Sequence, residues 1–144
     1  MTDTLKADRA LASRVRQRLD DDRQSRDLAS CDVTVAAGRA TITGHVRSRQ
    51  VARGLIAAAR GVPGVSGVDE SLVADDELEQ RVAAAIAGSP LNRRSRLVVR
   101  SALGRVGVGG VYASKDAWDE AVRVGAATVG VLSAVALRAN EVSS

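Results

Sequence analysis

Aromatic side chains are nearly missing from this chain, which has one Tyr, one Trp and no Phe among 144 residues. The hydrophobic core must therefore consist of Val, Leu, Ile and Ala, with little ring stacking. Single-stranded nucleic acids are usually held on several aromatic faces, so that class of binding protein is disfavoured. The single cysteine, Cys31, excludes an internal disulfide and a cysteine-rich metal site. At the start of a predicted strand, it is expected to be a small buried apolar residue.

Long apolar runs are also missing. The longest one, residues 122–137, is interrupted by Arg123 and by several glycine and hydroxyl residues, and it is too short to span a bilayer. The first residues have no apolar stretch of the kind that a secretory signal peptide requires. We therefore expect a soluble cytoplasmic protein without a transmembrane segment.

Groups suited to catalysis are scarce. His45 is the only histidine, and the sequence places no acid, base or nucleophile beside it, so a structural or surface role is favoured. No phosphate-binding loop or zinc-ligand spacing is present. The aspartates of the Asp20–Asp32 region lack the spacing of a calcium loop, which favours a solvated helix end over a cation site. We expect a non-enzymatic protein with no cofactor and no metal centre.

What the chain does contain is a duplication. Residues 37–48 align with residues 103–114, because both segments read Gly-Arg, then alternating apolar positions, then Gly and Ser. The same register continues without a gap, so that residues 62–65 correspond to residues 128–131. A shared register over this length indicates two copies of one structural unit.

Both halves show the same predicted order of elements, which is helix, strand, strand, helix, strand. The first helix is expected over about residues 8–21. Its counterpart is expected to start at Asp76, which can cap the helix together with Glu79, three residues further along. Ser48 and Ser114 are the expected N-caps of the second helices.

This order predicts an α+β fold of two tandem two-layer αββαβ modules, residues 7–74 and 75–140. In each module two helices would lie on one face of a three-stranded mixed sheet.

Glycine and proline mark the turns of both modules. The residues expected to form these turns and strand ends are Gly38, Gly44, Gly61, Pro63, Gly64, Gly104 and Gly110.

Residues 7–74 resemble the BON domain, which is named for bacterial OsmY and nodulation proteins. The likeness is carried by Val33-x-Val35-x-x-Gly38, by Ile42-x-Gly44-x-Val46 with Ser48, and by Gly61-Val62-Pro63-Gly64-Val65-x-x-Val68. Residues 75–140 keep a degenerate form, in which Gly130-Val131 followed by Ala134 replaces the closing motif. The resemblance implies a non-catalytic binding module of envelope or osmotic-stress proteins, linked to anionic phospholipid surfaces or, in some cytoplasmic members, to small-ion sensing.

Arginine is concentrated in one segment of the second module, although the net charge of the chain is only +4. Near an anionic lipid surface each basic residue gains roughly 1 kcal/mol, and nucleic-acid phosphates attract arginine in a similar way. A solvated loop entering the hairpin is the other interpretation. The candidate surface-binding residues are Arg93, Arg94, Arg96, Arg100 and Arg105.

Apolar residues of the second module are expected to form an interface. Val98 alternates outward in its predicted strand, and the last strand, residues 131–137 with Leu132, is apolar on both faces, which requires cover on both. Trp118 is expected at the edge of the core, with an interface or a membrane anchor as alternatives. We expect this sheet face to pack on the first module or on another chain, and a monomer with Val98 and Leu132 exposed would contradict this.

These observations favour a binding protein. The leading hypothesis is a tandem BON protein that acts on an anionic phospholipid surface or a partner protein, in osmotic or envelope stress. The alternatives are a sensor of a small monovalent cation such as K⁺, and a nucleic-acid-binding protein that uses residues 93–105.

Overall fold

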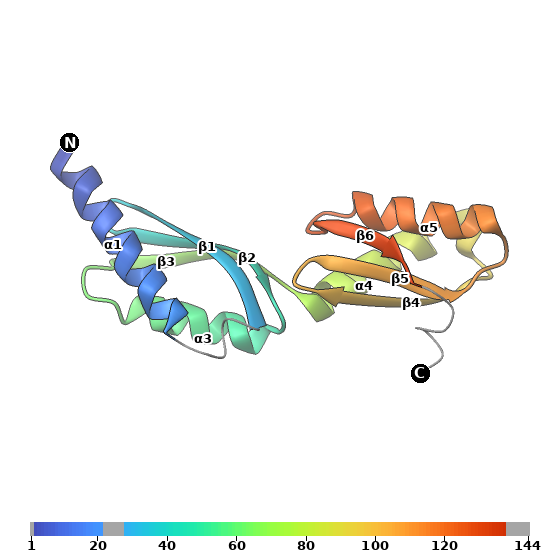
Figure 1. Cartoon of the computed structure of the whole chain (residues 1–144), viewed down its shortest axis with the longest axis horizontal. Helices are drawn as coiled ribbons and strands as arrows, with labels where there is room; N and C mark the ends of the chain where they lie inside the picture. Colours follow the sequence, from blue (N-terminus) through green and yellow to red (C-terminus); the bar gives the residue numbers. More distant parts are fainter. Residues whose placement is uncertain (1, 22–27, 138–144) are drawn as a thin grey trace. The chain divides into compact units, whose positions relative to one another are not determined.

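The chain folds into two α+β units, each with two helices and a three-stranded sheet (Figure 1). A computed structural model describes residues 2–21 and 28–137. The units divide between Ala74 and Asp75. In chain order the elements are α1 (Thr2–Asp20), β1 (Ala29–Ala36), β2 (Arg39–Val46), α3 (Arg49–Arg60), β3 (Gly67–Ala74), α4 (Asp75–Ala87), η1 (Pro90–Asn92), β4 (Arg96–Ala102), β5 (Arg105–Val111), α5 (Lys115–Ala127) and β6 (Ser133–Ala136).

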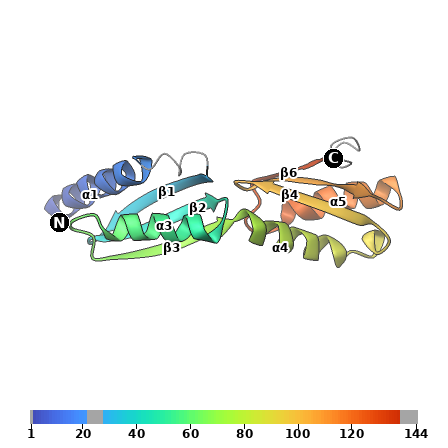
Figure 2. The ribbon, with the colours of Figure 1, turned by 90° about the horizontal axis from the view of Figure 1, so that it is seen from below.

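The predicted mixed sheet is present in both units. In the first unit β2 lies in the centre, antiparallel to β1 and parallel to β3. The second unit repeats this pattern, with β5 antiparallel to β4 and parallel to β6. In each unit both helices cover the same face of the sheet, as Figures 1 and 2 show. The two-layer αββαβ architecture predicted from the sequence is therefore confirmed.

The cores are aliphatic, as the scarcity of aromatic residues predicts. Helix residues spaced four apart, Leu11, Val15 and Leu19 in α1, are buried against the first sheet. In α4 the corresponding positions are Leu78, Val82 and Ile86, which are fully buried. The small alanines of α3 and α5 let those helices approach their sheets closely.

A carboxylate from the first helix of each unit holds the hairpin turn. The buried Asp8 accepts hydrogen bonds from the backbone N–H groups of Ala37 and Gly38, at 2.9 and 3.1 Å. In the second unit the buried Asp75 accepts from the Leu103 N–H at 3.1 Å and from the Ser101 hydroxyl at 2.7 Å. We call this arrangement the turn clamp.

The turn clamp supports an unusual backbone. Ala37 and Leu103, the residues before the turn glycines, have φ of 51° and 50°, in the left-handed region that non-glycine residues rarely adopt. The other side of each turn is also bonded, because Gly38 O accepts from Ser66 N at 2.9 Å and Gly104 O accepts from Leu132 N at 2.8 Å. Each turn thus joins the first helix, the hairpin and the start of the third strand.

Several expected boundaries differ from the observed ones. Helix α1 begins at Thr2, before the expected start, and α4 begins at Asp75, so that Asp76 lies in its first turn. Glu79 does not complete a capping box, because its carboxylate accepts a hydrogen bond from the Ser101 N–H. The last strand is shorter than expected and covers only Ser133–Ala136.

Other local expectations are met. Ser48 and Ser114 cap α3 and α5 by accepting hydrogen bonds from the N–H groups of Val51 and Ala117. The Gly61–Gly64 turn follows α3, and only Gly64 has a positive φ there, because Gly61 keeps φ at −76°.

Gly44 and Gly110 test how strictly the duplicated strand end requires glycine. A Cβ on Gly44 would lie 2.2 Å from Ser30 O, and one on Gly110 would lie 1.9 Å from Arg96 O. We expect Gly44→Ala to lower the free energy of unfolding by about 3 kcal/mol, through strain and backbone collision. Urea unfolding measures this, with Gly54→Ala in α3 as control. Gly54 has no atom within 4 Å of the added Cβ, so alanine there should stabilise by about 0.5–1 kcal/mol. Equal effects of both substitutions would contradict this account.

The turn clamp makes a second prediction. Asp75→Asn replaces one acceptor oxygen by an NH₂ group, which cannot accept from Ser101 or Leu103, so we expect a loss of about 1–3 kcal/mol of unfolding free energy. The exposed neighbour Asp76 is the matched control, since its substitution by Asn removes the same charge from the same helix end. Thermal unfolding measures the stability of both variants. An equal loss of stability in Asp76→Asn would show that the effect comes from the charge at the helix end and not from the hydrogen bonds of the turn clamp.

Candidate functional site

The candidate site is the face of the second sheet that α4 and α5 do not cover. Paired residues of neighbouring strands share a face, and every second residue along a strand returns to it. The register joins Arg96 to Val111, Val98 to Gly109, Arg100 to Gly107, Gly107 to Val135 and Arg105 to Ser133. We call this surface the open face of the second unit. The arginine and valine side chains of this face are Arg96, Val98, Arg100, Arg105, Val111 and Val135.

The corresponding face of the first unit is polar and carries an internal ion pair. Arg39 holds Asp69 with two hydrogen bonds, Nε to Oδ2 at 2.5 Å and Nη2 to Oδ1 at 2.8 Å. The hydrogen bond from Arg39 lowers the pKa of Asp69 below its ordinary value, and the same bond, together with the charge of Asp69, raises the pKa of Arg39. Threonine, serine and His45 occupy much of the rest of that face.

The alignment of the two halves of the sequence allows the two faces to be compared. The offset that relates Arg39 to Arg105 relates Asp69 to Val135, so the second unit has the equivalent arginine but a valine in place of its carboxylate partner. In the same way Asp32 of β1 corresponds to Val98 of β4. Among the residues whose side chains the structure describes, 4–21 and 28–137, no carboxylate forms an ion pair with the guanidinium of Arg96, Arg100 or Arg105.

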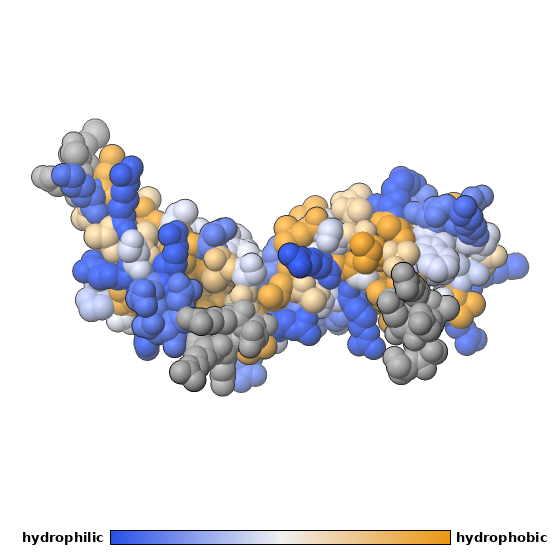
Figure 3. Space-filling view, in the orientation of Figure 1, coloured by the Kyte–Doolittle hydropathy of each residue, from blue (hydrophilic) through white to orange (hydrophobic). Residues whose placement is uncertain are grey.

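The apolar residues of the open face are accessible. Val111 is 69% exposed and Val135 is 58% exposed, whereas Val98 is half-buried. Leu137 lies over Gly107, because a Cβ on that glycine would meet Leu137 Cδ2 at 2.5 Å. In Figure 3 apolar side chains gather on the visible face of the second unit, beside strongly hydrophilic ones. The open face thus combines cationic and apolar side chains.

The structure separates the five candidate arginines into two groups. Arg96 and Arg100 lie in β4, and Arg105 is the first residue of β5. Arg93 ends η1 and Arg94 lies in the turn that follows, where both are exposed. Val111 was not among the predicted site residues, and only the register shows that Val111 and Val135 share the face of the arginines.

Trp118 and Leu132 lie away from this face. Trp118 is half-buried on α5 and stacks on Tyr112, with ring centroids 5.1 Å apart and an angle of 11° between the planes. Burial raises the pKa of Tyr112. Leu132 immediately precedes β6 and is 66% exposed.

The other candidate groups form no site in the described part of the chain. His45 lies in β2 on the uncovered face of the first sheet, level with Ser30 and Val73. No group of three or more metal-ligating side chains occurs among the described residues. Asp22 and Asp27 of the acidic region lie outside these residues. No helix in the described ranges is long and apolar enough to cross a membrane.

Cys31 lies on the opposite, inward side of β1, half-buried against the core of the first unit. Burial raises the pKa of its thiol, and the charges of Asp32 and Asp20 add to this effect. The folded chain therefore binds the thiol proton more tightly than the unfolded chain. The resulting stability is fully present below the unfolded pKa and is lost as the pH rises through the folded value.

We accordingly expect Cys31 to react more slowly with a small disulfide reagent in the native protein than in urea. The midpoint of its pH–rate profile should lie at a higher pH than that of the unfolded chain, because the thiolate is the reactive form. The rate is measured from the absorbance of the chromophore that the disulfide reagent releases. Because the chain has one cysteine, this signal reports on Cys31 alone. Coincident midpoints for the two states would contradict the assignment.

Comparisons with known proteins support the fold and part of the family prediction. A comparison with protein families matches residues 7–73 to the BON domain. No curated protein matches the chain. Two solved structures of CdsD, a structural protein of the type III secretion system of Chlamydia trachomatis, have a similar fold; the second is of its C-terminal domain.

The first CdsD structure has a TM-score of 0.68 at 16% identity over 93% of this chain, and the second has 0.66 at 15% over 91%. The chain spans 65% of the first structure and 67% of the second. At this identity the likeness shows the fold alone. The match to the BON family covers residues 7–73, which lie in the first unit.

Proposed function

We propose that this chain is a non-catalytic tandem BON protein that binds an anionic phospholipid surface through the open face of its second unit. The observation that carries the proposal is the grouping of Arg96, Arg100 and Arg105 with Val111 and Val135 on one sheet face. None of these three guanidinium groups is neutralised by a carboxylate of the described residues. A membrane interface offers phosphate groups to the cations and acyl chains to the valines.

The expected magnitude is modest. Three arginines near an anionic surface contribute about 3 kcal/mol, from roughly 1 kcal/mol each. Val111 and Val135 add apolar area that can enter the headgroup region. Binding of this strength is reversible and depends strongly on salt.

The exposed valines distinguish a lipid surface from a nucleic acid. Phosphates of either ligand attract arginine, but a nucleic-acid backbone offers the valines no apolar environment. The two aromatic rings of the chain stack on each other, so they present no free platform for bases. The open face is therefore better suited to lipid.

The family likeness supports the setting of this activity. BON domains are associated with the cell envelope and with stress, and we propose that this chain acts in osmotic or envelope stress, from the cytoplasmic side of the membrane. The second unit, which repeats the fold of the first, would be a diverged BON module that supplies the contact.

The test is co-sedimentation of the full chain with vesicles. We expect binding to vesicles that contain phosphatidylglycerol, no binding to pure phosphatidylcholine, and loss of binding as salt rises. The triple variant Arg96→Gln, Arg100→Gln, Arg105→Gln should bind about a hundredfold more weakly at low salt.

A matched variant separates the open face from net charge. Arg9, Arg53 and Arg60 are exposed on α1 and α3 of the first unit, and their substitution by Gln removes the same total charge. That variant should bind nearly as well as the parent. An equal loss in both variants, or tighter binding to duplex DNA than to anionic vesicles, would overturn the proposal. A shift in thermal unfolding with K⁺ but not with vesicles would favour the cation sensor instead.

A further inference from the structure

The edge strand β6 differs from the other three edges of the two sheets. An exposed edge presents unpaired N–H and C=O groups, and proteins usually protect it with charged residues or proline. Edge strand β1 carries Asp32, β3 carries Asp69 and Glu70, and β4 carries Arg96 and Arg100. Strand β6 and its two flanking residues read Leu-Ser-Ala-Val-Ala-Leu, with neither charge nor proline.

The free backbone groups of β6 can be assigned. Leu137 N donates to Val108 O at 2.8 Å, on the β5 side. Successive residues of a strand direct their N–H and C=O groups to opposite sides, so Val135 also faces β5. The N–H and C=O groups of Ala134 and Ala136 therefore point away from β5, on the side where the described residues add no further strand to the sheet.

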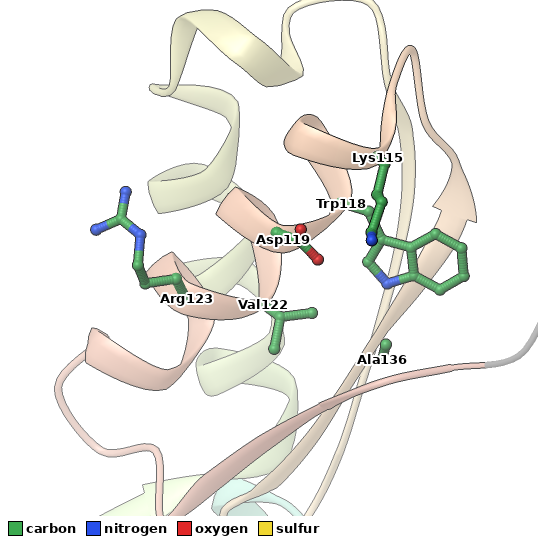
Figure 4. A pocket seen from close by; sticks show the side chains of 6 residues that line it. All are labelled: Lys115, Trp118, Asp119, Val122, Arg123 and Ala136. Atoms are coloured by element: carbon green, nitrogen blue, oxygen red, sulfur yellow. The ribbon is translucent and has the colours of Figure 1, made fainter.

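The surroundings of this edge are apolar and incompletely packed. A hollow of about 550 Å³ lies between α5 and β6, bordered by Trp118, Val122 and Ala136. Figure 4 shows Trp118 and Val122 projecting from α5 toward Ala136. The buried Nε1 of Trp118 has no hydrogen-bond partner among the described residues, whereas most buried donors are paired.

We propose that β6 pairs antiparallel with β6 of a second copy of this chain. The contact would be two-fold symmetric, so that each copy presents the same residues to the other. Ala134 and Ala136 of each copy would exchange backbone hydrogen bonds, and the two three-stranded sheets would join into one of six strands. An exposed sheet edge can bind an additional uncharged strand. Strand β6 of a second copy is itself such a strand.

The α5 side would complete the contact. Strand β6 has only four residues, so its backbone bonds alone would be too few for a stable dimer. Joining the sheets brings the two α5 helices side by side, with Trp118 and Val122 of each copy facing the shared hollow. Lys115, Asp119 and Arg123 also border the hollow. Arg123 forms an ion pair with Glu120, so the surface carries charges of both signs.

The test measures self-association of the full chain without lipid, so its outcome is independent of the proposed membrane binding. Sedimentation velocity over a concentration series should show a monomer–dimer equilibrium. Trp118, the only tryptophan, should change its fluorescence with the same dissociation constant. A monomer at every concentration, with constant Trp118 fluorescence, would overturn the proposal.

Ala136→Pro removes an outward N–H and leaves the Leu137 to Val108 bond in place. We expect it to raise the dissociation constant at least about tenfold, whereas Ala136→Ser, which keeps the amide, should dimerise like the parent. Leu132→Lys, at an exposed position next to the edge, adds like charges to the contact and provides a second block if the proline variant fails to fold. A dimer that persists in both Ala136→Pro and Leu132→Lys would rule out pairing through β6.

Discussion

Both units depend on the turn clamp, in which a buried helix carboxylate binds the amides of a hairpin turn. Asp8 and Asp75 are the only buried acidic side chains among the described residues, and each is satisfied by hydrogen-bond donors of its own turn. The bonds hold Ala37 and Leu103 in a left-handed conformation that would otherwise be costly. The turn carbonyl also accepts a hydrogen bond from the residue just before the third strand. The hairpin turn is thus bonded to the first helix through the carboxylate and to the third strand through its own carbonyl. A carboxylate buried without those donors would be strongly destabilising.

This frame leaves the uncovered sheet face free to change. The turn clamp and the serine caps use no side chain from that face. The first unit carries an ion pair and hydroxyl groups on this face. The second unit has an arginine at the position equivalent to Arg39, with Val135 and Val98 at the positions equivalent to Asp69 and Asp32. Two units with the same architecture can therefore carry a polar face in one case and a cationic and apolar face in the other.

The sequence predicted what local signals determine. Helix periodicity located Leu11, Val15 and Leu19 in the core, and Ser48 and Ser114 marked helix starts because a cap bonds within its own first turn. The turn clamp was missed because Asp8 binds amides that are distant in the sequence, and an aspartate near a helix start gives no sign of such a contact. The composition of the open face was missed in part, since only the strand register shows that Val111 and Val135 share it with Arg100.

Both proposals depend on the same two sequence differences between β3 and β6. Asp69 and Glu70 of β3 correspond to Val135 and Ala136 of β6. The first replacement removes the partner of an arginine and makes the open face apolar and cationic, and both together remove the charges that protect a sheet edge. Pairing of two β6 strands would place two open faces on one continuous sheet. A surface that bound weakly through one copy would then bind through two, which raises the overall affinity without any new contact to the ligand. The unprotected edge and the proposed binding face therefore both follow from the same two sequence differences between the units.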